Sequence, residues 1–299
     1  MRLVIALGGN ALLRRGEPPD AEIQLAHVRR AAPALAEVAA QHDLILTHGN
    51  GPQVGLLARE SGDDRALSGA YPLDSLVAET QGLIGYWLQQ SIASAGLAGP
   101  IVSLVTQTIV AADDASLTDP TKFVGSLYDE EHARALSAGG WEMRPDGPAW
   151  RRVVPSPLPL RVVEAPIIEA LSRQGTTVIC AGGGGAPVVS EGGALRGIEA
   201  VIDKDHVASL LALELGADEL VLLTDVAGVI SNYGTPEARA LGEVTVDDLG
   251  AEQFAAGSMG PKVVAACRFV RETGRPATIG SLDDLASVIE GRSGTRIRR

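Results

Sequence analysis

The sequence predicts an α/β protein with a mainly parallel sheet that helices cover on both faces. Short apolar runs rich in β-branched residues alternate along the chain with longer segments of helical pattern. The runs are almost continuously apolar, as strands buried on both faces are, and this order places sites at the carboxyl ends of the strands. A length of 299 residues, 45% of them hydrophobic, is enough for one large domain or two closely joined lobes.

Each predicted strand is followed by at least one predicted helix. The strands are RLVIAL (2–7), DLILTH (43–48), GPIVSLVTQTIV (99–110), TTVICA (176–181), ELVLLTD (219–225) and PATIG (276–280). The helices are expected at about 20–41, 53–60, 74–95, 164–174, 204–216, 258–273 and 282–290. This alternation is typical of parallel strands, because a crossover between them usually contains a helix.

Residues 113–160 interrupt the alternation. They are rich in Pro, Gly, Asp and Trp and include the turn signal RPDGPAW at 144–150. Because Phe123, Trp141 and Trp150 give this segment apolar groups to bury, we expect a small hairpin-bearing subdomain that protrudes from the sheet, not a disordered linker.

Charge, cysteines and hydropathy limit the partners and the compartment. The net charge of −12 argues against a general surface for nucleic acid or an anionic membrane. Cys180 and Cys267 lie in apolar runs, which favours buried free thiols in a reducing compartment over a disulfide. The apolar start breaks at Gly-Gly-Asn, so no signal peptide is predicted, and no run approaches the roughly 18 apolar residues of a membrane helix. We expect a soluble cytoplasmic protein.

Glycine-rich turns follow three of the predicted strands, in ALGGN (6–10), THGNGPQVG (47–55) and CAGGGGAPV (180–188). Glycine lets the backbone approach a ligand closely, so the N–H groups of such a turn can hold an anion, helped by the positive end of a following helix. Taken alone, each turn is more simply a tight connection. Three in one sheet favour an anion site, although neither a Walker loop nor a dinucleotide-binding G-x-G-x-x-G is present.

Lysine is scarce: the chain has 22 arginines but only Lys122, Lys204 and Lys262. Surface Arg and Lys are nearly equivalent as solvated charges, so the remaining lysines mark positions that need a compact ammonium group. Lys204 stands between two aspartates at the predicted start of a helix, where a carboxylate would keep it charged. Lys262 lies in the first turn of a helix, which disfavours a cation unless it gains a partner such as phosphate. Lys122 is also compatible with a plain surface position, although this is the weaker of its two interpretations.

These features together predict phosphoryl transfer. The transition state of that reaction needs charge neutralisation and alignment, which cations and N–H cradles supply. No Ser–His–Asp set is evident. His48 and His206 lack ligand spacing to a second His or Cys, so no metal site built from protein side chains is predicted.

A series of motifs extends over nearly the whole chain, from residue 5 to residue 297. In order, they are ALGGNAL, THGNGPQVG, TQGLIGYWLQQ, DPTK followed by Gly and Tyr, RRVVPSPLP, AGGGGAPVV, EAVIDKDHVA, LLTDVAGV, GSMGPKV and GRSGTRI. Together they resemble the carbamate kinases of the amino acid kinase superfamily. GGN is common to the superfamily, whereas HGNGPQVG, VIDKD and GSMGPK in this order are far more specific.

The resemblance implies the open three-layer αβα sandwich of the amino acid kinase fold, with the protruding subdomain at about 113–160. Residues 1–299 would form a single domain, with a carbamate-side lobe at about 1–200 and a nucleotide-side lobe at about 201–299. The implied protein is a homodimer that acts on small molecules, with neither nucleic acid nor membrane as a partner. It would transfer a phosphoryl group reversibly between ATP and carbamate, which breaks down to ammonia and CO₂, as in arginine metabolism. Mg²⁺ would be held mainly by the nucleotide phosphates.

The resemblance also assigns roles to residues. Lys204 and Lys262 would stabilise the transferring phosphoryl group, Asp205 would organise the two ammonium groups, and Lys122 would reach in from the subdomain. The remaining expected contacts are Gly8, Gly9 and Asn10 with phosphates, Gly49, Asn50 and Gly51 with carbamate, and Asp225, Met259, Gly260 and Lys262 with the nucleotide. Carbamate is small and planar, so backbone N–H groups and one amide are enough to bind it, without an Arg clamp.

Two alternatives remain at the level of sequence. One is a sister enzyme of the same superfamily acting on another small carboxylate or phosphate, and the other is a catalytically silent nucleotide-binding sensor. The chain reads PTKFVGSLY where the family usually reads PTKPIGPFY, so Phe123 and Ser126 replace two prolines. Fewer prolines predict a less rigid loop around Lys122 and leave room for a different substrate preference. Retention of all three lysines argues against the sensor.

Overall fold

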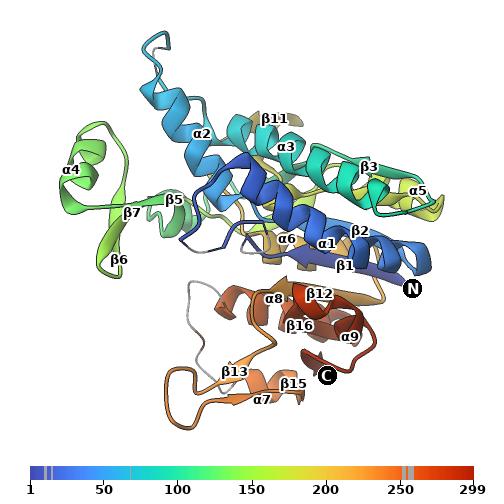
Figure 1. Ribbon diagram of the computed structural model, residues 1–299. Coiled ribbons are helices and arrows are strands. Elements are labelled where there is room, and N and C mark those ends of the chain that lie inside the picture. Colours follow the sequence, from blue (N-terminus) through green and yellow to red (C-terminus); the bar gives the residue numbers. More distant parts are fainter. Residues whose placement is uncertain (10–11, 15, 68, 251–253, 255–258) are drawn as a thin grey trace.

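The computed structural model describes residues 1–9, 12–14, 16–67, 69–250, 254 and 259–299. Its largest sheet has eight strands, six of them parallel to one another (Figure 1). Across the sheet the strands are β15 (Glu243–Thr245), β17 (Thr295–Arg298), β16 (Ala277–Ser281), β12 (Glu219–Thr224), β1 (Arg2–Leu7), β2 (Asp43–His48), β9 (Thr177–Ile179) and β3 (Ile101–Ser103).

Strand β1 lies at the centre of this sheet and organises the site. It pairs in parallel with β12 on one side and with β2 on the other, and β2 pairs in parallel with β9. The carboxyl ends of all four strands therefore meet at one edge of the sheet. This brings the glycine turns after β1, β2 and β9 together although they are far apart in the sequence.

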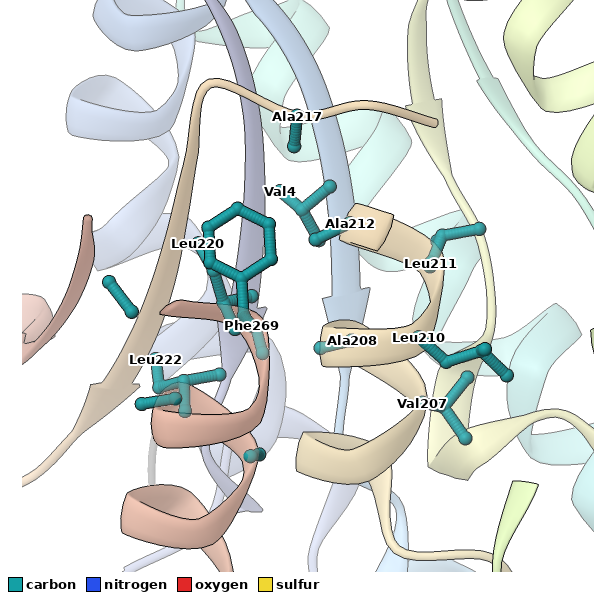
Figure 2. Packing of buried hydrophobic residues seen from close by; sticks show 14 of the residues in the cluster. Val4, Val207, Ala208, Leu210, Leu211, Ala212, Ala217, Leu220, Leu222 and Phe269 are labelled. Carbon is teal, nitrogen blue, oxygen red and sulfur yellow. The ribbon is translucent and has the colours of Figure 1, made fainter. Parts of the chain in front are cut away.

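Each face of the sheet has its own hydrophobic core. Along β1, Val4 and Ala6 enter one cluster of buried residues, and Leu3, Ile5 and Leu7 enter the other. This alternation follows from the two-residue period of a strand. Figure 2 shows part of the first core, where side chains of β1, β12, α6 and the helix that bears Phe269 fill the space between helices and sheet.

Helices supply the outer layers on both faces. The first core is closed by α5 (Ala165–Arg173), α6 (Lys204–Glu214), α7 (Val246–Gly250) and α8 (Met259–Thr273). The second is closed by α1 (Ala21–Gln41), α3 (Leu73–Ser94) and α9 (Leu285–Ile289). The predicted fold class, a three-layer αβα sandwich on a mainly parallel sheet, is therefore confirmed. No helix in the described ranges is long and apolar enough to cross a membrane.

The predicted single strand at 99–110 is wrong. Its first half is β3 of the main sheet, and its second half is β4 (Gln107–Val110) of another sheet, which runs β11 (Ala194–Gly197), β10 (Ala186–Glu191), β4 and β8 (Pro159–Val162). Between the halves, the backbone N–H and C=O of the buried Thr106 both bond to the Gln81 side chain, at 3.0 Å each. Both halves are apolar, so periodicity alone cannot reveal the change of sheet.

The segment at 113–160 forms the expected protruding subdomain. It contains β5 (Lys122–Tyr128), α4 (Glu130–Ala138) and the hairpin β6 (Met143–Asp146) and β7 (Ala149–Val154), which stand apart from the main body (Figure 1). The predicted turn joins β6 to β7. The predicted loop around Lys122 is wrong, because these residues are a strand paired with β7. The Phe123 ring, at one of the two positions that lack the proline, lies 5.7 Å from the Arg151 guanidinium.

The remaining elements are short or lie beside the site. They are α2 (Gly51–Asp63), the paired strands β13 (Ile230–Ser231) and β14 (Arg239–Ala240), and the 3-10 turns η2 (Ala115–Leu117), η3 (Gly182–Gly184) and η4 (Leu282–Asp284).

The subdomain is seated on α2 by a contact between two glycines. A Cβ placed on Gly55 of α2 would lie 2.0 Å from the Cα of Gly125 in β5, and Gly125 has φ +72°. The two backbones approach closely only because neither residue has a side chain. A small apolar cluster around this contact includes Val54, Val124 and Val154.

We expect Gly55→Ala to loosen the subdomain. The added methyl group overlaps backbone and cannot be relieved by a rotamer change, so the free energy of unfolding should fall by about 1–3 kcal/mol. Chemical denaturation and limited proteolysis of residues 122–154 measure the effect. Gly62→Ala in the same helix is the control. A Cβ there comes no closer than 3.7 Å to Ala70, so the change should be neutral or stabilising by up to about 1 kcal/mol. Equal stability and equal cleavage of Gly55→Ala and wild type would contradict the proposed seat.

Candidate active site

Two glycine turns meet at the carboxyl edge of the main sheet. Gly8 and Gly9 follow β1, and Gly49 follows β2 and leads into α2, which begins at Gly51. A Cβ on Gly49 would lie 3.1 Å from both N and Cα of Gly9 and 3.4 Å from Cδ of Lys204. The turns therefore touch each other and the lysine side chain. No described atom outside their own neighbours lies within 4 Å of a Cβ on Gly9 or Gly51.

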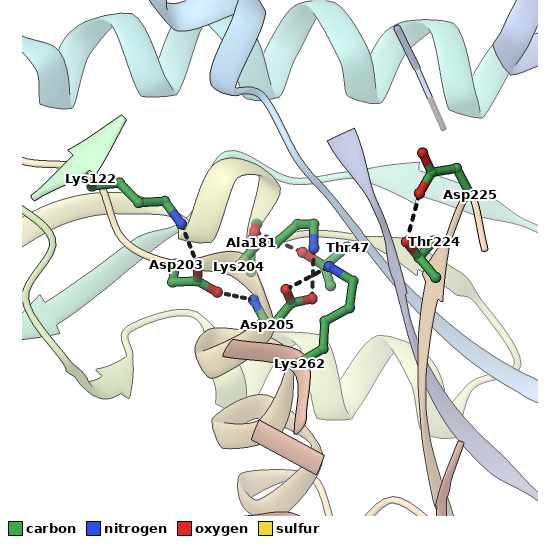
Figure 3. Close-up of polar contacts among 9 residues, drawn as sticks. All are labelled: Thr47, Lys122, Ala181, Asp203, Lys204, Asp205, Thr224, Asp225 and Lys262. Atoms are coloured by element: carbon green, nitrogen blue, oxygen red, sulfur yellow. Dashed lines mark hydrogen bonds and ion pairs between the residues drawn. The ribbon is translucent and has the colours of Figure 1, made fainter. Parts of the chain in front are cut away.

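Asp205 holds two lysine ammonium groups beside these turns. Its Oδ1 accepts from Nζ of Lys204 at 2.6 Å, and its Oδ2 accepts from Nζ of Lys262 at 3.1 Å (Figure 3). The contact joins α6 to α8 through two residues that lie 57 positions apart in the sequence. Lys262, in the unfavourable first turn of its helix, thus gains a carboxylate partner.

The charges of this group do not balance. Asp205 is 3% exposed and Lys262 is 8% exposed, so water screens their interaction little. Burial alone would raise the pKa of Asp205, but the two lysines hold it below its ordinary value. Burial, together with the neighbouring Lys262, lowers the pKa of Lys204. Two ammonium groups against one carboxylate leave a net positive charge, which favours binding of an anion.

Lys122 reaches the same region from the subdomain. Its Nζ contacts Oδ2 of Asp203, the residue that caps the N-terminus of α6 (Figure 3). The other carboxylate oxygen of Asp203 accepts from the backbone N–H of Asp205 at 2.9 Å. Burial works against ionisation, but Lys122 and then Lys204 hold the pKa of Asp203 far below its ordinary value. One carboxylate therefore links the subdomain to the start of the helix that bears the lysine pair.

The backbone explains why Lys122 lies there. Lys122 pairs with Val154 across β5 and β7. The next residue, Pro155, accepts a hydrogen bond from the N–H of Val201 at 3.0 Å, two residues before Asp203. Asp203 was not among the predicted site residues. Its position before a predicted helix indicates a cap, but a partner 81 residues away leaves no pattern in the sequence.

The other predicted site residues that the structure describes lie in three places. Asn50 is buried beside the turn after β2 and bonds to Thr80 at 2.8 Å. Asp225 follows β12 and bonds to Thr224 at 3.0 Å, across β1 from the lysines in Figure 3. Met259 and Gly260 begin α8, two residues before Lys262. Asn10 lies outside the described residues.

His48 at the end of β2 is buried and neutral. Its Nδ1 lies 3.0 Å from the carbonyl oxygen of Gly49, to which it donates as a neutral imidazole. Burial, aided by the neighbouring Lys204, lowers the pKa of His48 to about 4. His48 therefore supports the glycine turn and is a poor general base at neutral pH.

The third glycine turn forms a wall behind the site. Thr47 donates to the carbonyl of Ala181 at 2.8 Å (Figure 3), and the N–H of Ala181 donates to Oγ1 of Thr106 at 2.9 Å. These bonds hold Ala181 at φ +51°, which is unusual for a residue with a side chain. In the predicted anion cradle, Gly182 packs on His48 and Gly183 packs on Asn50.

No group of three or more His, Cys, Asp or Glu that could hold a metal ion occurs in the part of the chain that the structure describes. Asp203 and Asp205 are both engaged by lysines.

The chain is similar to known proteins over nearly its whole length. The model of the amino acid kinase family matches residues 1–281. A carbamate kinase of Rhizobium meliloti (strain 1021) is 49% identical over 99% of this chain and 93% of its own length. A carbamate kinase of Escherichia coli (strain K12) is 47% identical over 99% of this chain and 98% of its own length. The structure of a Giardia lamblia carbamate kinase bound to AMP-PNP superposes with a TM-score of 0.90 at 40% identity, covering 99% of this chain and 98% of that one.

A family model that matches residues 1–281, together with identity of this extent to curated relatives, defines the family. The chain belongs to the amino acid kinase family and, within it, to the carbamate kinases.

We expect exchange of the site lysines for arginine to abolish most activity. Lys204→Arg and Lys262→Arg should each lower kcat/KM at least about 100-fold, roughly 2.7 kcal/mol, because a planar guanidinium cannot place one charge between Asp205 and the phosphoryl group. Lys122→Arg should lose less, since its side chain is 35% exposed and can adjust. Kinetics and thermal unfolding of each variant make the measurement. Arg134→Lys, at an exposed site, is the reverse control and should be silent within about 0.5 kcal/mol. Wild-type kinetics in both Lys204→Arg and Lys262→Arg would show that these positions do not require lysine.

We also expect His48 to reduce stability in mild acid. The unfolded imidazole binds a proton near its ordinary pKa of 6.5, whereas the folded one stays neutral down to about 4. Between these values the unfolded state binds more protons than the folded state. The free energy of unfolding should therefore decrease by up to about 1.4 kcal/mol for each unit by which the pH is lowered.

Chemical denaturation of His48→Gln and wild type at pH 7, 6 and 5 tests this. His48→Gln should lose less stability on acidification. His132→Gln is the control, because its hydrogen bond to the Asp129 side chain raises the pKa of the exposed His132, which cannot contribute to an acid loss. Parallel pH profiles of wild type and His48→Gln would contradict the buried neutral imidazole.

Proposed function

We propose that this chain transfers the phosphoryl group of carbamoyl phosphate to ADP, forming ATP and carbamate, and catalyses the reverse reaction. The observation that carries the proposal is the pair of buried ammonium groups of Lys204 and Lys262 on one carboxylate, against the touching turns of Gly9 and Gly49. The high identity to carbamate kinases supports the choice of carbamate.

The chemistry needs no general base. An oxygen of the ADP β-phosphate attacks phosphorus, the bond from phosphorus to the carbamoyl oxygen breaks, and its electron pair leaves on carbamate. No proton moves in this exchange, because the attacking oxygen is already ionised and carbamate leaves as a weakly basic anion. This agrees with a site in which Asp205 is engaged by two lysines and His48 by a carbonyl.

The site then acts through alignment and charge. In this proposal Lys204 and Lys262 neutralise the oxygens of the transferring phosphoryl group, and Asp205 holds both ammonium groups apart and in place. Lys122 leaves Asp203 to contact the phosphoryl group when substrate binds. The proposed contacts of the substrates are Gly8, Gly9 and Asn10 for phosphates, Gly49, Asn50 and Gly51 for carbamate, and Asp225, Met259, Gly260 and Lys262 for the nucleotide.

The proposal extends to the ion, the lobes and the assembly. Mg²⁺ enters as part of the nucleotide substrate, which approaches from the lobe at about 201–299, and carbamate binds in the lobe at about 1–200. A homodimer is supported by exposed apolar side chains at the free edge of β3, where Leu83, Tyr86 and Val105 are 39%, 56% and 54% exposed. Two buried free thiols support a reducing compartment such as the cytoplasm.

We expect the purified protein to form ATP from ADP and carbamoyl phosphate only with a divalent ion such as Mg²⁺. Three cationic side chains converge on the site, but the described residues offer no metal cluster, so the ion must accompany the nucleotide. A coupled ATP assay with carbamoyl phosphate, acetyl phosphate and N-acetylglutamyl phosphate measures the preference. Faster turnover of another acyl phosphate would indicate a sister enzyme, and nucleotide binding without turnover would indicate a sensor.

A further inference from the structure

Thr80 and Gln81 begin the TQGLIGYWLQQ motif, and the proposed reaction assigns them no role. Both lie on α3, at 0% and 1% exposure. They lie behind the turn after β2 (residues 49–51), which is proposed to bind carbamate and is called the acceptor turn below. The other buried residues of this helix are mainly apolar, and burying an unpaired polar group is costly, so these two polar side chains need partners. Their hydrogen bonds supply these partners.

The hydroxyl of Thr80 fixes the direction of the Asn50 amide. Oγ1 of Thr80 donates its single proton to the carbonyl of Val77 at 2.8 Å. Towards Asn50 the hydroxyl can therefore only accept, so Asn50 must turn its NH₂ group to Thr80, with Nδ2 at 2.8 Å from Oγ1. The carbonyl oxygen Oδ1 is left as an acceptor. Within the described residues Oδ1 has no hydrogen-bond partner, and it is not among the fully buried unpaired atoms.

Gly183 restricts the plane of the Asn50 amide. A Cβ on Gly183 would lie 2.1 Å from Nδ2, 2.2 Å from Cγ and 2.4 Å from Oδ1 of Asn50, so the whole amide rests on the glycine backbone. Gly183 has φ +63°, which suits glycine.

Gln81 in turn fixes the glycine turn that contains Gly183. Its Oε1 accepts from both N and Oγ1 of Thr106, and Oγ1 of Thr106 accepts from the N–H of Ala181, two residues before Gly183. Adjacent residues of α3 thus position the amide and its support.

We propose that Thr80 is a positioning residue that presents Oδ1 of Asn50 to the amino group of the carbamoyl substrate, and that this contact distinguishes carbamoyl phosphate from acetyl phosphate. The inference rests on the proposed function. The two compounds differ only in an NH₂ group, which donates hydrogen bonds, against a CH₃ group, which does not. An acceptor held in one orientation favours carbamoyl phosphate. An Asn50 amide that was free to flip would present its NH₂ group as often as its carbonyl oxygen, and the preference for carbamoyl phosphate over acetyl phosphate would be lost.

Kinetics of Thr80→Val and Thr80→Ser with both acyl phosphates and MgADP test the proposal. Valine keeps the shape but removes the acceptor, so kcat/KM for carbamoyl phosphate should fall at least about 10-fold, mainly through KM, while that for acetyl phosphate should change less than about 3-fold. Serine keeps the hydroxyl and should retain the wild-type preference within about 2-fold. Where acetyl phosphate is not turned over, its inhibition constant against carbamoyl phosphate replaces kcat/KM.

Thermal unfolding of each variant checks the fold, and Thr80→Ala replaces Thr80→Val if the latter does not fold. An equal loss for both acyl phosphates, or a serine variant that loses the preference as valine does, would overturn the role of Thr80. Both of these outcomes leave the proposed function intact. A wild-type protein that does not use carbamoyl phosphate would instead contradict the function itself.

Discussion

The rest of the site depends on the carboxylate of Asp205 between Lys204 and Lys262. Two ammonium groups this deeply buried would repel each other without it, and a buried charge without a partner costs several kcal/mol. Holding them together requires α6 and α8 to pack side by side, which they do over a core of small and apolar residues and through a hydrogen bond from Ser209 to the carbonyl of Ala265 at 2.8 Å. The net positive charge that remains favours the binding of an anion.

The central position of β1 supplies the other half of the site. Its parallel neighbours bring two glycine turns to one edge, where they touch each other and the side chain of Lys204. The subdomain is joined to this arrangement by one carboxylate, Asp203, which both caps α6 and contacts Lys122. A movement of the subdomain would therefore change the contact at the start of the helix that bears Lys204.

A second, uncharged layer lies behind the charged one. Thr47, Thr80, Gln81 and Thr106 are all buried, and each bonds to another polar group of the layer or to the backbone of the acceptor turns. Such a network has low tolerance for substitution because each member satisfies the next. It holds Ala181 at φ +51°, a backbone conformation that a residue with a side chain adopts rarely. The precision of the acceptor turn thus comes from hydroxyl and amide groups, and the charge of the site comes from lysines.

The sequence alone determined the fold class and the central strands, and it singled out the three lysines as candidate site residues. The predicted strands at 2–7 and 43–48 coincide with β1 and β2 because buried parallel strands are short, continuous apolar runs, which are a local property. Lysine scarcity marked Lys204 and Lys262 because composition is visible without a fold. Only the tertiary structure decided the division of 99–110 between two sheets, the strand around Lys122, and the partners Asp203 and Thr80. Each of these depends on residues at least 25 positions apart in the sequence, and no local pattern encodes which of several polar side chains will meet.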